Sequence, residues 1–187
     1  RDRSVSRGLG DVYKRQIYGF TDVNVANSFP TEAREVAQNL AQEQFDAVYS
    51  SPMSRCTKLS AYCGYPHPIL DERLKELNFG NWEMQNWATL QDPLLQEWYS
   101  NWIHIPAGGG ESFMNQYQRV RRFLDELRQK PFRHVCLFVH SGTIRCAHIY
   151  AGMISFTEAF SKDIPYGGRS DIPVSYTHLR AHETLSD

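Results

Sequence analysis

The hydrophobic pattern in the first half of the chain changes from helical to strand-like spacing and back. Apolar side chains recur three and four residues apart over residues 30–44, which predicts an amphipathic helix with a proline in its first turn. Residues 45–49 form a short apolar run of strand length. A second helix is predicted to begin with Ser51 as its N-cap and Pro52 as its first helical residue, and to end at Gly64.

The second half of the chain continues this alternation. Short strands are predicted around Leu74 and Leu77, and apolar residues spaced three and four apart predict an amphipathic helix over 113–127. The apolar run 135–139 is typical of a buried parallel strand, and a helix is predicted to follow from about Thr143. The other face of the 113–127 helix is predicted to be solvated, and it carries Arg119, Arg121, Arg122, Asp125 and Glu126.

Alternating strands and helices predict an α/β fold, a three-layer α/β/α sandwich with a mainly parallel sheet. We expect this domain to span residues 17–168. Residues 1–16 and 169–187 do not continue the hydrophobic pattern, and both resemble translated adaptor or vector sequence. We therefore interpret them as non-native extensions that take no part in the predicted fold.

The composition of the 187 residues is that of an ordinary globular domain, with 41% hydrophobic and 13% aromatic residues. A formal net charge of -1, without a basic stripe, argues against a nucleic-acid partner. The sequence has no apolar run long enough for a membrane span or a signal peptide, so we expect a cytoplasmic protein. The four cysteines show no metal-binding or disulfide spacing, and neither a metal nor another cofactor is predicted.

Polar residues follow two of the predicted strands at the points where helices begin. Arg55 lies just after the first junction, and His140 ends the apolar run at the second. Since parallel strands end at one edge of a sheet, a phosphate there would meet a guanidinium, an imidazole and two helix N-termini. A metal-free phosphoryl site also needs a proton donor, for which Glu76 is the candidate. The alternative is that Arg55 pairs with a surface carboxylate and His140 is a core histidine.

Four ordered motifs carry a family resemblance. They are residues 49–56 (YSSPMSRC), 73–83 (RLKELNFGNWE), 110–112 (GES) and 138–145 (FVHSGTIR). In this order they resemble the motifs of the histidine phosphatase superfamily, the phosphoglycerate-mutase-like phosphatases. Two further stretches, 18–22 and 92–99, make the sequence most similar to the alpha-ribazole phosphatase branch.

The resemblance implies a phosphomonoesterase that works in two steps: one histidine attacks phosphorus, and water then hydrolyses the phosphohistidine. By motif, Arg55 would bind phosphate oxygens and His140 would stabilise the transferring group, while Glu76 would protonate the leaving oxygen and later activate water. Ser141 would add a phosphate contact through its N–H or its hydroxyl group. The implied substrate is a small phosphate ester, alpha-ribazole 5′-phosphate in cobalamin biosynthesis. Phosphoglycerate-mutase-type transfer to a second substrate is the alternative.

The sequence departs from the family pattern at the nucleophile. The resemblance places that histidine in an Arg-His motif at the end of the first strand. No histidine precedes His67, which lies between two prolines in a predicted loop. We expect the chain as written to lack both the motif and its strand, and to be inactive. The departure also raises the alternative of a non-catalytic phosphate-binding or interaction module.

The tryptophans of the chain are concentrated in one segment, as Trp82, Trp87, Trp98 and Trp102. This clustering allows two interpretations. The residues either form a small aromatic core beneath a cap or line a lid that stacks on a planar leaving group such as a benzimidazole riboside. We favour the aromatic core.

Overall fold

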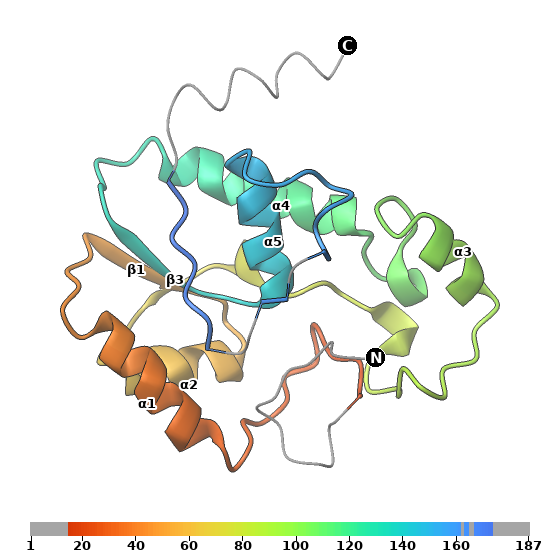
Figure 1. Ribbon diagram of the computed structural model, residues 1–187, viewed down its shortest axis with the longest axis horizontal. Coiled ribbons are helices and arrows are strands. Elements are labelled where there is room, and N and C mark those ends of the chain that lie inside the picture. The colour runs from red at the N-terminus through yellow and green to blue at the C-terminus, as the bar shows by residue number, and fades with distance from the viewer. Residues whose placement is uncertain (1–14, 162, 165–166, 174–187) are drawn as a thin grey trace.

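A parallel sheet lies at the centre of the protein, in a computed structural model that describes residues 15–161, 163–164 and 167–173 (Figure 1). Its strands are β1 (Ala47–Ser50), β2 (Ile69–Leu70) and β3 (Val135–Phe138), in the order β2-β1-β3. Ser50 at the end of β1 pairs with Leu70 and with Phe138, so the carboxyl ends of all three strands lie at one edge. Among the described residues, β1 is the one strand that pairs with β3.

Helices cover both faces of this sheet, as the predicted α/β fold requires (Figure 1). The pair on one face comprises α1 (Phe29–Leu40) and α2 (Ser54–Tyr62). The pair on the other face comprises α4 (Phe113–Leu127) and α5 (Ser141–Tyr150). The remaining elements are α3 (Leu94–Ser100) and the 3-10 turns η1 (Glu72–Leu74), η2 (Gly80–Trp82) and η3 (Ala107–Gly109).

Several predicted boundaries were wrong, and local backbone conformation and hydrogen bonding explain two of them. The helix expected to begin at Ser51 begins at Ser54, because Met53 has an extended backbone and is itself the N-cap residue; the Ser51 hydroxyl contacts the Met53 N–H at 3.4 Å and His140 at 2.9 Å. Leu74 lies in η1 and not in a strand, because the Asp71 carboxylate accepts the Arg73 N–H and closes a 3-10 turn. The α1 helix ends at Leu40, and α5 begins two residues before the predicted Thr143.

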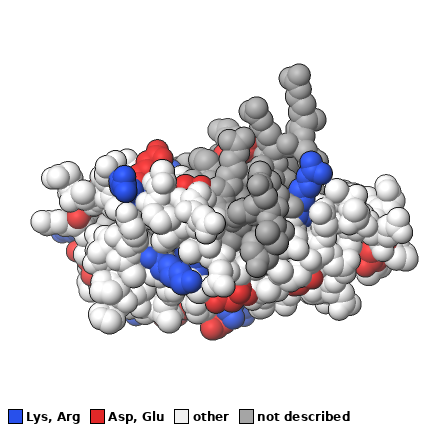
Figure 2. All heavy atoms as spheres, turned by 90° about the horizontal axis from the view of Figure 1, so that it is seen from below, with Lys and Arg blue, Asp and Glu red and all other residues white. Residues whose placement is uncertain are grey.

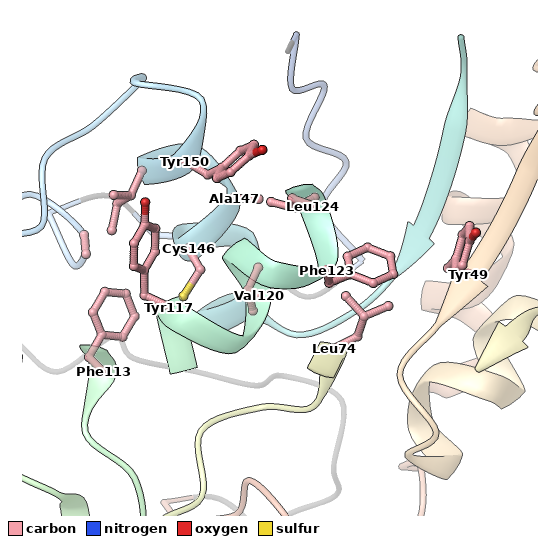
Figure 3. Packing of buried hydrophobic residues seen from close by; sticks show 12 residues of the cluster. Tyr49, Leu74, Phe113, Tyr117, Val120, Phe123, Leu124, Cys146, Ala147 and Tyr150 are labelled. Carbon is pink, nitrogen blue, oxygen red and sulfur yellow. The ribbon is translucent and has the colours of Figure 1, made fainter. Parts of the chain in front are cut away.

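The main core lies between the sheet and the helices α4 and α5 (Figure 3). Phe113, Val120 and Phe123 on α4 are each at most 2% exposed and pack with residues of α5 such as Cys146. Leu74 is fully buried against this cluster, so η1 is fixed beside the two helices. Burying a leucine of this kind stabilises the fold by about 2 kcal/mol.

A second core holds the segment that follows the sheet edge. Trp82 is fully buried and packs in a cluster with Ile17 and Leu77. Trp87 and Trp98 pack against this cluster. The Trp82 Nε1–H group donates to Asp92 Oδ2 at 2.7 Å, which satisfies the buried indole. The aromatic-core interpretation is therefore confirmed for this cluster, whereas Trp102 joins the main core.

The predicted terminal extensions fall mostly outside the described residues. Of residues 1–16, the structure describes Arg15 and Gln16, which pair with residues 86–87. Of residues 169–187 it describes 169–173, where the Arg169 guanidinium donates to Glu43 Oε1 at 2.8 Å. The extents of the domain and of the extensions remain predictions.

The part of the chain that the structure describes includes no helix that is both long and apolar enough to cross a bilayer. On the face seen in Figure 2, acidic and basic side chains are interspersed in a larger uncharged surface. The described charges on that face do not gather into one field of a single sign.

Candidate active site

The site begins where β1 and β3 end side by side. The Ser51 N–H donates to Phe138 O at 2.9 Å, which carries the pairing one residue beyond β1. The Ser51 hydroxyl then forms a 2.9 Å hydrogen bond with His140 Nε2. Ser51 is fully buried and His140 is 8% exposed, so this bond fixes the imidazole at the sheet edge.

His140 is the N-cap residue of α5, and its ring lies against the first turn of α2. The Cys56 Sγ atom is 3.6 Å from His140 Nε2 and 3.8 Å from Nδ1. Burial, and next the charge of Arg55, lower the pKa of His140 to about 3, although the nearby Glu76 carboxylate acts in the opposite direction. The histidine is therefore neutral at neutral pH in the unliganded protein.

Cys56 is not a candidate nucleophile. Its burial raises the pKa of the thiol to about 12, so the reactive thiolate is essentially absent at neutral pH. The Cys56 side chain instead supports the imidazole of His140 from α2.

The Glu76 carboxylate lies at the N-terminus of α5. Its Oε2 atom accepts the Gly142 N–H at 3.1 Å, and the Ser141 hydroxyl lies 3.4 Å from the same oxygen. Its Oε1 atom accepts from Gln116 Nε2 at 2.9 Å and from the Leu77 N–H at 3.0 Å. A side chain at Gly142 would overlap Glu76, so glycine is what allows the carboxylate to approach the helix.

These contacts set the charge of Glu76. Burial alone would raise the pKa of the carboxyl, but proximity to His140 and the hydrogen bonds from Gln116, Gly142 and Leu77 outweigh it and lower the pKa. The resting Glu76 is thus an anion next to a neutral histidine. A phosphate bound nearby would add negative charge and raise the Glu76 pKa, which is what proton donation to a leaving oxygen requires.

Arg119 on α4 holds the main chain on which Glu76 lies. Its guanidinium donates to the carbonyl oxygens of Arg73, Lys75 and Glu76 at 2.7–2.8 Å and forms a two-point ion pair with Glu111 at 2.9 Å. The prediction that Arg119 belongs to a solvated charged face was wrong, because it is 8% exposed. Its three carbonyl partners lie in a distant segment, which the spacing of the helix does not indicate.

Arg55 is on the first turn of α2, and loop carbonyls face its guanidinium. Nη2 donates to Gly19 O at 2.7 Å, and Nη1 donates to Thr21 O at 3.2 Å. The next residue of that loop region, Asp22, accepts the Ser54 N–H at 2.9 Å and the Ser54 hydroxyl at 2.8 Å. The N-termini of α2 and α5, which we expected to face a phosphate, thus each carry an internal carboxylate.

The structure therefore brings Arg55, Glu76, His140 and Ser141 to one edge of the sheet, where the charges of Arg55 and Glu76 both act on His140. Sequence reasoning did not assign a role in the site to Gln116, Arg119, Ser51 or Cys56. Ser51 and Cys56 flank Arg55 within one motif, which was a usable signal. The described residues contain no cluster of three or more His, Cys, Asp or Glu side chains able to hold a metal ion.

Known proteins are similar in sequence to this chain over more than half of its length. Phosphoserine phosphatase 1 of Hydrogenobacter thermophilus is 26% identical over 147 residues, which is 73% of this chain and 67% of the relative. This chain covers 59 to 67% of the lengths of the curated relatives that it matches, which for some of them is less than two thirds.

Solved structures agree with the fold. The crystal structure of phosphoglycerate mutase from Thermus thermophilus is 26% identical with a TM-score of 0.63, over 83% of each chain. A mycobacterial glucosyl-3-phosphoglycerate phosphatase has a TM-score of 0.70 at 22% identity, over 81% of this chain and 79% of that one, and supports the fold alone. The model of the histidine phosphatase superfamily (branch 1) matches residues 11–183. With its motifs assembled at one edge of a parallel sheet, the chain belongs to the histidine phosphatase superfamily.

Proposed function

We propose that this protein binds a small phosphate ester between Arg55 and His140, and that its native activity is phosphomonoester hydrolysis through a phosphohistidine. The observation that carries this proposal is the pairing of a neutral buried His140 with an anionic Glu76 at the start of α5. A bound phosphate would bring the negative charge that raises the pKa of both groups. Binding would therefore favour the protonated form of Glu76, which is the form that can donate a proton.

Each residue has a role that its geometry supports. Arg55 has N–H donors beyond the two that contact the loop carbonyls, and these would bind phosphate oxygens. His140, oriented by Ser51, would donate a hydrogen bond to the transferring group as its charge develops. Glu76 would take up a proton as the phosphate binds, pass it to the leaving oxygen and then activate water. The Ser141 hydroxyl lies beside Glu76, and this hydroxyl or the Ser141 N–H would add a phosphate contact.

Since no histidine precedes His67, we propose that the nucleophile is the group that this sequence lacks. We therefore expect the chain as written to bind phosphate without turnover. A version carrying an Arg-His motif ahead of Ile17 is expected to hydrolyse p-nitrophenyl phosphate and to form a phosphoenzyme that is labile in acid. A phosphoenzyme that is stable in acid and labile in base would rule out the histidine intermediate.

Binding is tested on the full chain by calorimetric titration with orthovanadate. Arg55→Ala is expected to weaken binding about a hundredfold, because the charge-assisted contacts to the anion are lost. Arg34→Ala, an exposed change on α1, is the matched control and should leave the affinity unchanged. Equal affinities in all three proteins would contradict the proposed site, and p-nitrophenyl phosphate hydrolysis that vanishes in His140→Ala would contradict the expected lack of turnover.

For the substrate we propose alpha-ribazole 5′-phosphate, on the strength of the stretches 18–22 and 92–99. The relatives named for phosphoserine and for phosphoglycerate suggest the competing leaving groups. Comparing kcat/KM for the three phosphate esters in a version carrying the Arg-His motif decides between them. A clear preference for phosphoserine would exclude our substrate assignment while leaving the phosphatase chemistry intact.

Two observations favour other functions. The likeness to a phosphoglycerate mutase favours phosphoryl transfer, which would appear as product phosphorylated on a second substrate instead of free phosphate. The contacts of Arg55 and of the Gly142 N–H with internal groups favour a non-catalytic module. Phosphate binding that persists without any turnover, even with the Arg-His motif present, would support that module.

A further inference from the structure

Glu83 holds a main-chain loop that lies next to the candidate site. It follows η2, and its carboxylate accepts the backbone N–H groups of Gly19, Phe20 and Thr21 at 3.0–3.1 Å. A fourth N–H, that of Phe79, donates to Glu83 Oε1 at 3.1 Å. Burial would raise the pKa of this carboxyl, but these donors outweigh it and lower the pKa. Glu83 is therefore a charged anchor for residues 19–21.

The carbonyl groups of the same loop face the opposite way, towards α2. Gly19 O and Thr21 O are the two acceptors of the Arg55 guanidinium described above. The 19–21 loop thus lies between a carboxylate that binds its N–H groups and a guanidinium that binds its C=O groups. The peptide group between Gly19 and Phe20 is bound at both ends, its C=O by Arg55 and its N–H by Glu83, and because both contacts polarise it in the same sense they strengthen each other.

The loop is closely fitted on two further sides. A side chain at Gly19 would overlap Leu77 O, on the residue that follows Glu76, so glycine is needed for this approach. Beyond the loop, Asp22 is fixed to the first turn of α2 through Ser54. The direction of the Arg55 guanidinium consequently depends on where Glu83 holds the loop.

The structure assigns Glu83 as a positioning residue for Arg55: through the 19–21 loop, it sets the orientation of the guanidinium at the candidate site. The assignment rests on the proposed phosphate-binding role of Arg55 and deepens it. Glu83 acts through the loop backbone and takes no part in the chemical step.

The first test uses the full chain without phosphate and follows the Arg55 side-chain N–H signals by ¹⁵N nuclear magnetic resonance. Glu83→Gln removes the charge and places an amide N–H₂ against backbone donors, so the Arg55 signals should shift and broaden. Glu97→Gln, an exposed change on α3, removes the same charge and should leave them in place. Unchanged Arg55 signals in a folded Glu83→Gln protein would overturn the assignment.

The second test is a double-mutant cycle on orthovanadate affinity. Glu83→Gln is expected to weaken binding about tenfold in the unmodified background, and less than about twofold once Arg55→Lys has removed the forked donor. Equal losses in both backgrounds would mean that Glu83 acts independently of Arg55, which overturns the assignment. Glu83→Asp keeps the charge and should restore part of both the signal position and the affinity, and its failure to restore either counts against the assignment.

These tests separate the inference from the proposed function. If the unmodified chain does not bind orthovanadate, the proposed site fails, while the Arg55 signals in the unliganded chain still decide the role of Glu83. If Glu83→Gln does not fold, the Arg55 signals of Glu83→Asp are compared with those of the control Glu97→Asp instead. A partial shift of these signals is expected in Glu83→Asp and none in Glu97→Asp. Identical Arg55 signals in that pair would overturn the assignment.

Discussion

The N-termini of α2 and α5 both carry an internal carboxylate, but the surroundings of the two differ. At α2, the exposed Asp22 binds one N–H group and one hydroxyl of Ser54. At α5, Glu76 binds the Gly142 N–H and is also held by Leu77 and by the fully buried Gln116. The same helix-end electrostatics therefore act in solvent at one junction and in a desolvated network at the other.

This difference indicates a division of roles between the junctions. An exposed carboxylate can be exchanged for a phosphate at little cost, because water satisfies it after displacement. A carboxylate held by a buried amide and next to an imidazole keeps its position, and its pKa responds to added charge. The α2 junction is thus suited to binding and the α5 junction to proton transfer.

Removing the main-chain support of Glu76 at the α5 junction should cause the largest loss of stability, and the matching change at the α2 junction a smaller one. Arg119→Met leaves Glu111 and three backbone carbonyls without their partner, and we expect a loss of about 3–5 kcal/mol in the free energy of unfolding. Arg55→Met at the more exposed junction should cost about 1–2 kcal/mol. Urea unfolding monitored by circular dichroism measures both.

The control is Arg122→Met, an exposed change on the same helix, which should stay within about 0.5 kcal/mol of the unmodified chain. Comparable losses for Arg119→Met and Arg55→Met would mean that the two junctions are equally buried in solution, contrary to the structure.

The pH dependence of stability should come from the α5 junction. The pKa of His140 falls from 6.5 to about 3 on folding, mainly through burial. Below pH 6.5, His140 therefore binds a proton in the unfolded chain but not in the folded chain. The free energy of unfolding decreases as pH falls from 6.5 to about 3. Glu76 adds to this loss below its ordinary value of 4.5, because its pKa is lowered on folding.

We expect His140→Gln to remove a pH-dependent loss on the order of a few kcal/mol, measured as the change in unfolding free energy between about pH 7 and about pH 5. His104→Gln, at an exposed position, serves as the control and should keep the full dependence. An unchanged slope in His140→Gln would show that another group causes the acid sensitivity.

The smallest expected changes in stability come from replacing the two carboxylates, Glu76 and Asp22, by their amides. Glu76→Gln keeps one acceptor but sets an amide N–H₂ against donors, and should lower stability by about 1–3 kcal/mol. Asp22→Asn, at the exposed N-terminus of α2, should cost about 0.5–1 kcal/mol. Thermal unfolding of both variants tests the order, and a larger loss for Asp22→Asn would reverse the proposed division of roles.

The elements that depend on local pattern were predicted well. The α4 helix spans the predicted residues 113–127, and β3 lies within the predicted strand. Gly64, expected just beyond the second helix, has a φ of 92°, the left-handed conformation that glycine adopts readily after a helix end. The parallel sheet follows from the same alternation.

The errors occurred where side chains compete for backbone groups. The sequence of residues 51–54 is compatible with a cap at Ser51, and its hydroxyl does accept the Met53 N–H at 3.4 Å, but the helix begins at Ser54 and the same hydroxyl binds His140, far along the chain. Asp71 closes a 3-10 turn where alternating leucines predict a strand. The Asp71 turn joins residues two apart and could have been found from the sequence, whereas the contact between Ser51 and His140 joins residues 89 apart and depends on the tertiary structure.

The sequence alone determined the class of fold, the order of the motifs and the residue types that meet at the sheet edge, because hydrophobic period and helix-end chemistry are local properties. Tertiary structure decided the charge states of His140 and Glu76 and the anchoring of the 19–21 loop by Glu83. Those properties depend on burial and on hydrogen bonds between segments about 40 to 65 residues apart, such as Gln116 to Glu76 and Glu83 to Gly19. They exist only once the chain has folded and excluded water from these contacts.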